Sequence, residues 1–150
     1  MTLSPIHGAL RWAGSTAGQR STLATASAEG KPSIVTSVAP DYGGEAAHWN
    51  PDDLFGAALS ACMMYTFLSI ARKARLDVRR YEDDFTVFPE TEGHRTRIAR
   101  VVLSPTITLA AGSDPGRAAA MLQKSHSYCV ISNSTTAQTT LRPTFRVLQP

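Results

Sequence analysis

The stretch at residues 50–74, NPDDLFGAALSACMMYTFLSIARKA, decides the fold. It predicts one long helix, because Asn50 is a favourable N-cap residue and Pro51 fits the first helical position. Acidic residues follow at the positive end of the helix dipole and basic residues close the segment at its negative end: Asp52 and Asp53, then Arg72, Lys73 and Arg75. The segment is apolar on nearly every side, so we expect this helix to lie inside the protein.

Length and composition are those of a globular protein. A chain of 150 residues is long enough to bury a sizeable core, and we expect residues 1–150 to form a single domain. The net charge of +3 is too diffuse to indicate nucleic acid as a partner. The N-terminus lacks a cationic start followed by an apolar run, so we expect a cytoplasmic protein. The apolar helix is interrupted by three polar residues, Ser60, Thr66 and Ser69, so we expect no insertion into a membrane.

The segments around this helix are mostly predicted strands. Three short strands are predicted before it, with a Gly-rich loop at residues 39–49 between the last of them and the helix: residues 6–12, 21–27 and 31–38. After it come two strands, a second helix from residue 113 or 114 to about residue 128, and a closing strand: residues 82–90, 95–109 and 144–148. Strands occur in runs rather than alternating with helices, so the pattern predicts an α+β fold with antiparallel sheet.

The two cysteines, Cys62 in the long helix and Cys129 just past the second helix, are the candidate reactive groups. In the cytoplasm such a pair is more often catalytic, redox-active or metal-binding than a static disulfide. A thiol peroxidase needs two cysteines that can approach and a cation that lowers the pKa of the attacking one. Cys62 lies about three turns into its helix, beyond the N-terminal dipole, so we expect a side chain to activate it. Arg11 and Arg20 are the candidates, with Asp52 or Asp53 to hold the guanidinium.

Other interpretations of the same residues remain open. Both cysteines fit a role as inert core residues, since a free cysteine behaves as a small hydrophobe. A metal site is an outside alternative that uses Cys62, Cys129, His126 and His48, although no CxxC pair supports it. The apolar neighbours of the first cysteine border any pocket around it, or else belong to the core: Met63, Tyr65 and Phe67.

The sequence also resembles a known family. NPDDLFGAALSAC resembles the NPE-x-L-x-x-A-x-x-x-C segment of the OsmC/Ohr family of organic hydroperoxide resistance proteins and osmotically inducible peroxidases. HSYCVISNS resembles the second cysteine segment of that family, C-x-x-S-N, and APDYGGEAAHW is similar to the Gly-rich loop that precedes the family helix. The order of the predicted elements agrees, so the resemblance covers essentially the whole chain.

This resemblance implies a fold, a reaction and partners. The OsmC-like fold has antiparallel sheets wrapped around long central helices in an intertwined homodimer. By the resemblance Cys62 is the peroxidatic cysteine and Cys129 the resolving one, in a divergent OsmC-like member. Asp52 falls where the family has a glutamate, and Arg20 comes nearest to its catalytic arginine. The implied substrate is an organic hydroperoxide, the implied reductant is a dithiol of the lipoyl type, and no cofactor is implied.

The departure from the family pattern leaves a second function open. Asp52 is one methylene shorter than the family glutamate, which changes its reach toward an arginine. The alternative is therefore a non-enzymatic protein that binds a small ligand in an apolar pocket of the same scaffold.

Overall fold

A computed structural model describes residues 3–14, 16 and 22–150. It divides the chain into two compact units, residues 1–54 and residues 55–150, and each is described by itself. That residues 1–150 make up a single domain stays a prediction.

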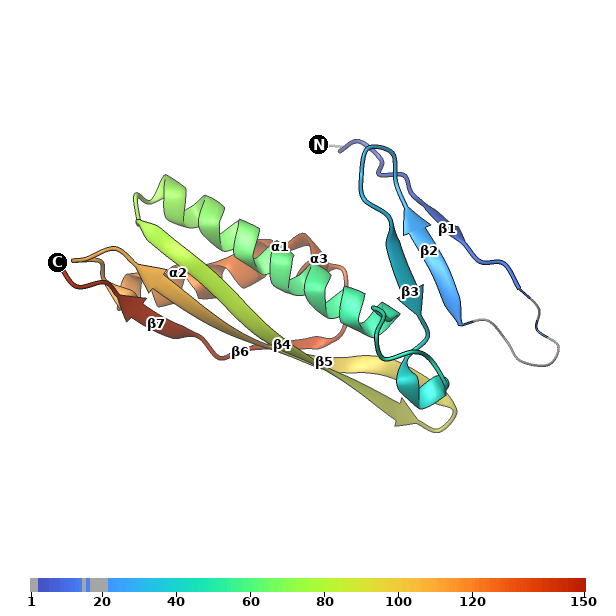
Figure 1. The fold of residues 1–150 in the computed structure, drawn as a ribbon. Helices are drawn as coiled ribbons and strands as arrows, with labels where there is room; N and C mark the ends of the chain where they lie inside the picture. Colours follow the sequence, from blue (N-terminus) through green and yellow to red (C-terminus); the bar gives the residue numbers. More distant parts are fainter. Residues whose placement is uncertain (1–2, 15, 17–21) are drawn as a thin grey trace. The chain divides into compact units, whose positions relative to one another are not determined.

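The first unit contains a three-stranded antiparallel sheet in which each strand pairs with the next along the chain (Figure 1). Its strands are β1 (Ala9–Arg11), β2 (Leu23–Ser27) and β3 (Ile34–Ser37). All three predicted strands are therefore confirmed, with shorter bounds than expected. Gly30 has a φ of 71° in the turn between β2 and β3, a conformation that glycine adopts at little cost. The expected loop after β3 contains one short 3-10 helix, η1 (Pro40–Tyr42).

The long helix is α1 (Pro51–Lys73). The side-chain oxygen of Asn50 accepts hydrogen bonds from the backbone N–H groups of Asp52 and Asp53, at 2.9 and 3.0 Å. The Asp53 carboxylate accepts the backbone N–H of Asn50 in return, at 3.1 Å. This reciprocal arrangement satisfies three backbone donors at the start of the helix and confirms the N-cap predicted from the sequence.

The second unit contains a mixed sheet. Strands β4 (Val78–Glu92) and β5 (Arg95–Leu109) form a long antiparallel hairpin whose turn contains Gly93, with a φ of 64°. Two short strands, β6 (Gln138–Leu141) and β7 (Thr144–Val147), both pair parallel to β5. The α+β class is confirmed, but the expectation of a wholly antiparallel sheet was wrong in this detail. Strand β6, in a Ser- and Thr-rich segment, was not predicted from the sequence.

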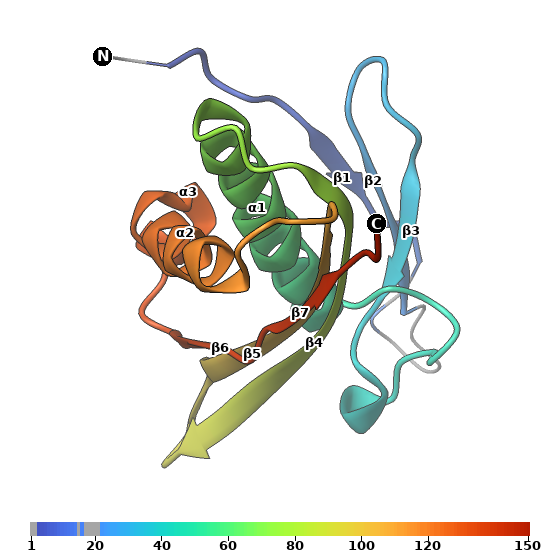
Figure 2. The same cartoon turned by 90° about the vertical axis from the view of Figure 1, so that its left-hand side faces the viewer.

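Two helices follow the hairpin: α2 (Pro115–Tyr128) and the short α3 (Val130–Asn133). The Asp114 side chain caps α2 by accepting the backbone N–H of Gly116 at 2.9 Å, as the predicted start at residue 113 or 114 implied. The three helices lie together on one face of the β4–β7 sheet (Figure 2). The fully buried side chains between them form the core: Leu59, Met63 and Phe67 of α1, Leu103 and Ile107 of β5, and Leu122 of α2.

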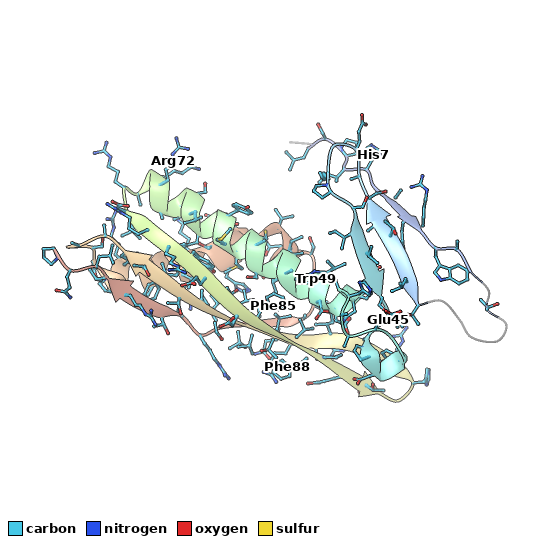
Figure 3. The ribbon with its side chains drawn as sticks, viewed as in Figure 1. His7, Glu45, Trp49, Arg72, Phe85 and Phe88 are labelled. Atoms are coloured by element: carbon cyan, nitrogen blue, oxygen red, sulfur yellow. The ribbon has the colours of Figure 1, made fainter. Side chains whose placement is uncertain are left out.

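Helix α1 sits close to β4 because of a glycine. A Cβ atom at Gly56 would lie 2.6 Å from ring carbons of Phe85 and 2.8 Å from a methyl of Val87. Phe85 faces α1, whereas Phe88 lies on the opposite face of the strand, with the Arg100 guanidinium 3.7 Å from its ring centroid (Figure 3). The close approach therefore depends on the absence of a side chain at Gly56.

A half-buried carboxylate links α1 to both strands of the hairpin. Asp83 of β4 accepts the Ser60 hydroxyl at 2.5 Å and the backbone N–H of Ser104 at 2.7 Å. Burial raises the pKa of Asp83, and the hydrogen bonds from Ser60 and Ser104 oppose that rise. These bonds fix the position of α1 along the sheet. The α1 residue that they hold, Ser60, lies two residues before Cys62.

One face of α1 is left uncovered in the single chain. The buried strip contains Gly56, Leu59, Met63, Phe67 and Ala71. The opposite face is also apolar or small, yet it is exposed: Ala58, Ala61, Tyr65 and Ser69. Among the described residues, α1 is the one helix whose length and composition would suffice to cross a membrane, a property that core helices share.

Candidate active site

Cys129 lies at the junction of two helices. It is the C-cap residue of α2 and the N-cap residue of α3, and its side chain is fully buried. Its Sγ atom accepts the backbone N–H of Ser132 at 3.4 Å. The Asn133 side chain donates to the carbonyl oxygen of Ser127 at 3.0 Å, which ties the end of α3 back to the last turn of α2. The segment around Cys129 thus folds into a tight corner that holds the thiol in place.

Cys62 lies on α1 against this corner. Its side chain is partly buried and packs against the core cluster to which Cys129 belongs. Burial raises the pKa of the Cys62 thiol, but hydrogen bonds from the backbone of Ile131, from the Cys129 thiol and from the backbone of Val130 outweigh it. The net effect is a pKa below the usual range of a cysteine. These backbone donors are the N–H groups of the first turn of α3, which have no partner within their own helix.

Thr66, one turn beyond Cys62, contributes less. Its hydroxyl lies close enough to the thiol to lower the Cys62 pKa. The Thr66 proton, however, is donated to the backbone carbonyl oxygen of Cys62 at 2.8 Å. A hydroxyl has one proton to donate, so the two backbone groups of α3 and the Cys129 thiol stabilise the thiolate.

The pKa of Cys129 is shifted in the opposite direction from that of Cys62. Burial raises the pKa of its thiol to about 11, the N–H of Ser132 opposes this rise, and the neighbouring Cys62 adds to it. At neutral pH Cys129 therefore keeps its proton and donates it toward Cys62. The pair is polarised, with one sulfur biased toward the thiolate and the other held as a thiol. Both cysteines are free in the structure.

The activating groups differ from those expected. A side-chain cation was expected, but within the described part of the chain the Cys62 pKa is lowered mainly by backbone N–H groups and a second thiol. Arg20 lies outside the described residues, and Arg11 is exposed on β1. Helix α3 was not predicted, because the segment VISN starts with two β-branched residues. The available signal was the Ser-Asn pair that follows Cys129 and closes the corner.

Asp52 and the predicted pocket residues have distinct surroundings. The Asp52 carboxylate forms no hydrogen bond or ion pair with any described residue, while Asp53 caps the helix. Met63 and Phe67 are fully buried in the core, and the Phe67 ring packs near that of Tyr81. Tyr65 is 68% exposed and lines a cavity of about 770 Å³ between α1 and α2. The catalytic and substrate-binding roles of these residues stay predictions.

The structure shows no candidate metal centre within residues 3–14, 16 and 22–150. No three His, Cys, Asp or Glu side chains come together there. His126 contributes to the corner at Cys129 through its backbone: its carbonyl oxygen accepts the N–H of Cys129 at 3.4 Å. His48 lies in the first unit beside Glu45, with 3.6 Å between the ring nitrogen and the carboxylate.

The fold and this site define a class: an α+β protein with two hydrogen-bonded thiols, one on a long central helix and one at a helix junction. The sequence model of the family described as "OsmC-like protein" matches residues 43–144, about two thirds of the chain. The protein therefore belongs to the OsmC-like family, and the resemblance seen in the sequence is confirmed. No curated protein sequence matches the chain.

Solved structures agree with this assignment. An OsmC-like protein of unknown function from Vibrio cholerae is 27% identical, with a TM-score of 0.86 over 95% of this chain and 100% of that one. An organic hydroperoxide resistance protein from Elizabethkingia anophelis is 20% identical, with a TM-score of 0.74 over 98% and 99% of the two chains. The organic hydroperoxide resistance protein OhrB of Bacillus subtilis is 17% identical, with a TM-score of 0.62 over 94% and 98%.

Proposed function

We propose that this protein is a thiol-dependent peroxidase that reduces organic hydroperoxides. The observation that carries the proposal is the polarised pair, in which the pKa of Cys62 is lowered and that of Cys129 is raised to about 11. A thiolate is the attacking species in peroxide reduction, and a neighbouring thiol is the group that resolves the product. The organic hydroperoxide resistance proteins with the same fold support the choice of substrate class.

The reaction has two balanced steps. The Cys62 thiolate attacks the distal oxygen of R–O–OH, the O–O bond breaks, and Cys62 becomes a sulfenic acid. The leaving alkoxide takes up one proton and departs as an alcohol. The Cys129 sulfur then attacks the Cys62 sulfenic sulfur, and the sulfenic oxygen leaves as water with the thiol proton. A dithiol, which we propose to be of the lipoyl type, reduces the disulfide and returns both thiols.

Two further residues complete the proposed site. By the family resemblance Arg20 stabilises the thiolate and Asp52 holds Arg20. The Asp52 carboxylate, which has no partner among the described residues, is available for such a contact. Tyr65, exposed beside the cavity at α1, is the pocket residue best placed to meet an apolar substrate, with Met63 and Phe67 supporting it from the core.

We also propose that the protein acts in the cytoplasm as a homodimer. The exposed face of α1, made of Ala58, Ala61, Tyr65 and Ser69, is the surface that a second copy would cover, so the pocket beside Tyr65 would lie at the subunit interface. An apolar helix with one face in water gains stability when that face is buried. Both cysteines are free, which suits a reducing compartment.

The test is turnover of an alkyl hydroperoxide in the presence of a dithiol. The wild-type protein should consume peroxide catalytically, and the Cys62→Ser variant should not. The Cys129→Ser variant should react once and then stall as a sulfenic acid. If the Cys62→Ser variant turns over at the wild-type rate, the proposal is wrong.

The cavity beside α1 favours one alternative, a non-enzymatic protein that binds a small apolar ligand. A reduced protein that binds such a ligand tightly while leaving hydroperoxide untouched would support this alternative.

A further inference from the structure

Helix α3 is too short to be stable by itself. It has four residues, Val130–Asn133, and an isolated helix of fewer than about a dozen residues is marginal in water. Its first two residues are also β-branched, which lowers their helix propensity. Helix α3 nevertheless lies beside α1, directly after the end of α2 (Figure 2). Contacts outside its own backbone must therefore hold it there.

Side-chain hydrogen bonds tie both ends of α3 to its surroundings. At its start the Cys129 sulfur accepts the backbone N–H of Ser132 at 3.4 Å, and sulfur is a weak acceptor. At its end the Asn133 side-chain amide donates to the backbone carbonyl oxygen of Ser127 at 3.0 Å. Ser127 lies in the last turn of α2, where carbonyl groups lack partners within their own helix. The Asn133 bond is therefore the stronger of the two, and it joins α3 to a separate helix.

The position of α3 matters because its first turn faces Cys62. The backbone N–H groups of Val130 and Ile131 donate toward the Cys62 sulfur and lower the pKa of that thiol. A hydrogen bond weakens steeply when its donor moves or turns away from the acceptor. The Ile131 side chain packs against the core, but that of Val130 is 64% exposed, so packing fixes only one of the two donor residues.

We propose that Asn133 is a positioning residue, which holds the first turn of α3 against Cys62 through its hydrogen bond to Ser127. Asn133 acts through its neighbours rather than on the reacting sulfur. Its amide anchors the end of α3 to the last turn of α2, and this anchor fixes the direction in which the N–H groups of Val130 and Ile131 point.

A purely helical role for Asn133 makes the opposite prediction. Asparagine is a poorer helix former than alanine, which is the best. If α3 needed helix propensity alone, Asn133→Ala would preserve or strengthen it, because the backbone N–H of residue 133 would still donate to the carbonyl oxygen of Cys129. If the side-chain amide is needed, the same substitution loosens α3. One variant therefore separates the two roles.

The test follows the alkylation of Cys62 by iodoacetamide in the full-length protein over a range of pH, read by peptide mass. Asn133→Ala should raise the midpoint of this profile by about half a pH unit and slow labelling at neutral pH by about threefold, since one net hydrogen bond is worth a factor of this order. The rate on the alkaline plateau should stay at the wild-type value, because the thiolate is equally accessible in both proteins.

Ser134→Ala is the matched control. It removes the hydroxyl that donates to the carbonyl oxygen of Val130 at 2.7 Å, a bond that does not reach α2. The midpoint should therefore stay at the wild-type pH. An unchanged midpoint in Asn133→Ala, or an equal rise in Ser134→Ala, would overturn the proposal. So would a faster plateau rate for Cys62 with labelling of Cys129 at neutral pH, because that result would mean that the corner opens.

This role deepens the proposed function and rests on it only for its catalytic consequence. Oxidation of Cys62 by one equivalent of an alkyl hydroperoxide at neutral pH should slow in Asn133→Ala by the same factor as alkylation. If the wild-type protein does not react with hydroperoxide, the peroxidase function is contradicted, while the alkylation profile still decides the role of Asn133. Slower alkylation without slower oxidation would contradict the catalytic consequence alone.

Discussion

The Cys129 thiol donates a hydrogen bond to Cys62, and the two sulfurs belong to segments that are 67 residues apart in the chain. The same contact lowers the pKa of Cys62 and raises that of Cys129. The corner between α2 and α3 therefore delivers the second thiol and two backbone N–H groups to Cys62 together. One local structure therefore supplies both the resolving thiol and the groups that lower the Cys62 pKa, a role expected of a separate arginine.

The two cysteines should react with an alkylating agent over different ranges of pH. The thiolate is the nucleophile, so the alkylation rate of each cysteine rises through its own pKa. Cys62 should be alkylated at neutral pH, whereas Cys129, which is buried and has a pKa of about 11, should react only in alkaline solution. The measurement is the rate of iodoacetamide labelling at each cysteine, read by peptide mass. Preferential labelling of Cys129 at neutral pH would contradict the assignment.

Removal of one backbone donor should raise the Cys62 pKa. Val130→Pro deletes the N–H of the first residue of α3, a position that tolerates proline. The preceding residue, Cys129, has a φ of −71° and a ψ of 115°, which suits a residue before proline. Val130 is 64% exposed, so the side-chain change costs little. The Cys62 pKa should rise, and its labelling rate at neutral pH should fall by about tenfold if one such bond is lost.

The matched control is Val130→Ala, which shortens the side chain and keeps the N–H. It should label at the wild-type rate. If both variants label alike, the backbone of α3 is not what lowers the pKa of Cys62.

Ionisation of Asp83 should destabilise the fold. Burial makes its pKa higher in the folded than in the unfolded chain, so the folded state binds this proton more tightly. The free energy of unfolding therefore loses this contribution as pH rises from below the unfolded Asp pKa of about 3.9 through the raised folded value. Asp83→Asn, which stays neutral, should gain stability relative to wild type as pH rises from about 3 to about 7. Urea denaturation at several pH values measures this difference.

A carboxylate on the same strand provides the comparison for Asp83. Glu90 is exposed and makes no hydrogen bond or ion pair with the described residues. Glu90→Gln should show no such trend with pH. If the difference in free energy of unfolding between Asp83→Asn and wild type does not change over this pH range, ionised Asp83 does not destabilise the fold and the prediction is wrong.

The uncovered face of α1 should bind a second copy of the chain. A glutamate at the exposed Ala61 would be buried without a partner in such an interface, at a cost of several kcal/mol. Wild-type protein should sediment as a dimer, and Ala61→Glu should sediment as a monomer or lose stability with dilution. Ala120→Glu, at an exposed position on α2, should remain dimeric. Sedimentation of the wild type as a monomer at all concentrations would contradict the proposed dimer.

Local sequence signals predicted much of the fold. The caps of α1 and α2 depend on Asn50 and Asp114, whose side chains accept nearby backbone N–H groups, and such short-range bonds are visible in sequence. The bounds of β5 were also correct, since β-branched residues fill it and turn residues flank it. The parallel pairing of β6 and β7 with β5 was not predicted, because it depends on contacts with a strand distant in the chain.

The two cysteines of the site could be predicted from the sequence, but the groups that shift their pKa values could not. Cys62 and Cys129 stood out as the two cysteines of the chain, and their proximity was expected from the resemblance. The lowered pKa of Cys62 comes from the backbone of Val130 and Ile131, and backbone donors carry no signature in the residue types.

The most direct test of the central claim is the mass of the reduced protein after one equivalent of an alkyl hydroperoxide. The proposed chemistry predicts the loss of two hydrogens per chain, with tryptic peptides that join Cys62 to Cys129, and recovery of both thiols when a dithiol is added. The Cys129→Ser variant should instead gain one oxygen on Cys62. A protein that keeps both thiols after exposure, while a control thiol peroxidase in the same solution is oxidised, would contradict the claim.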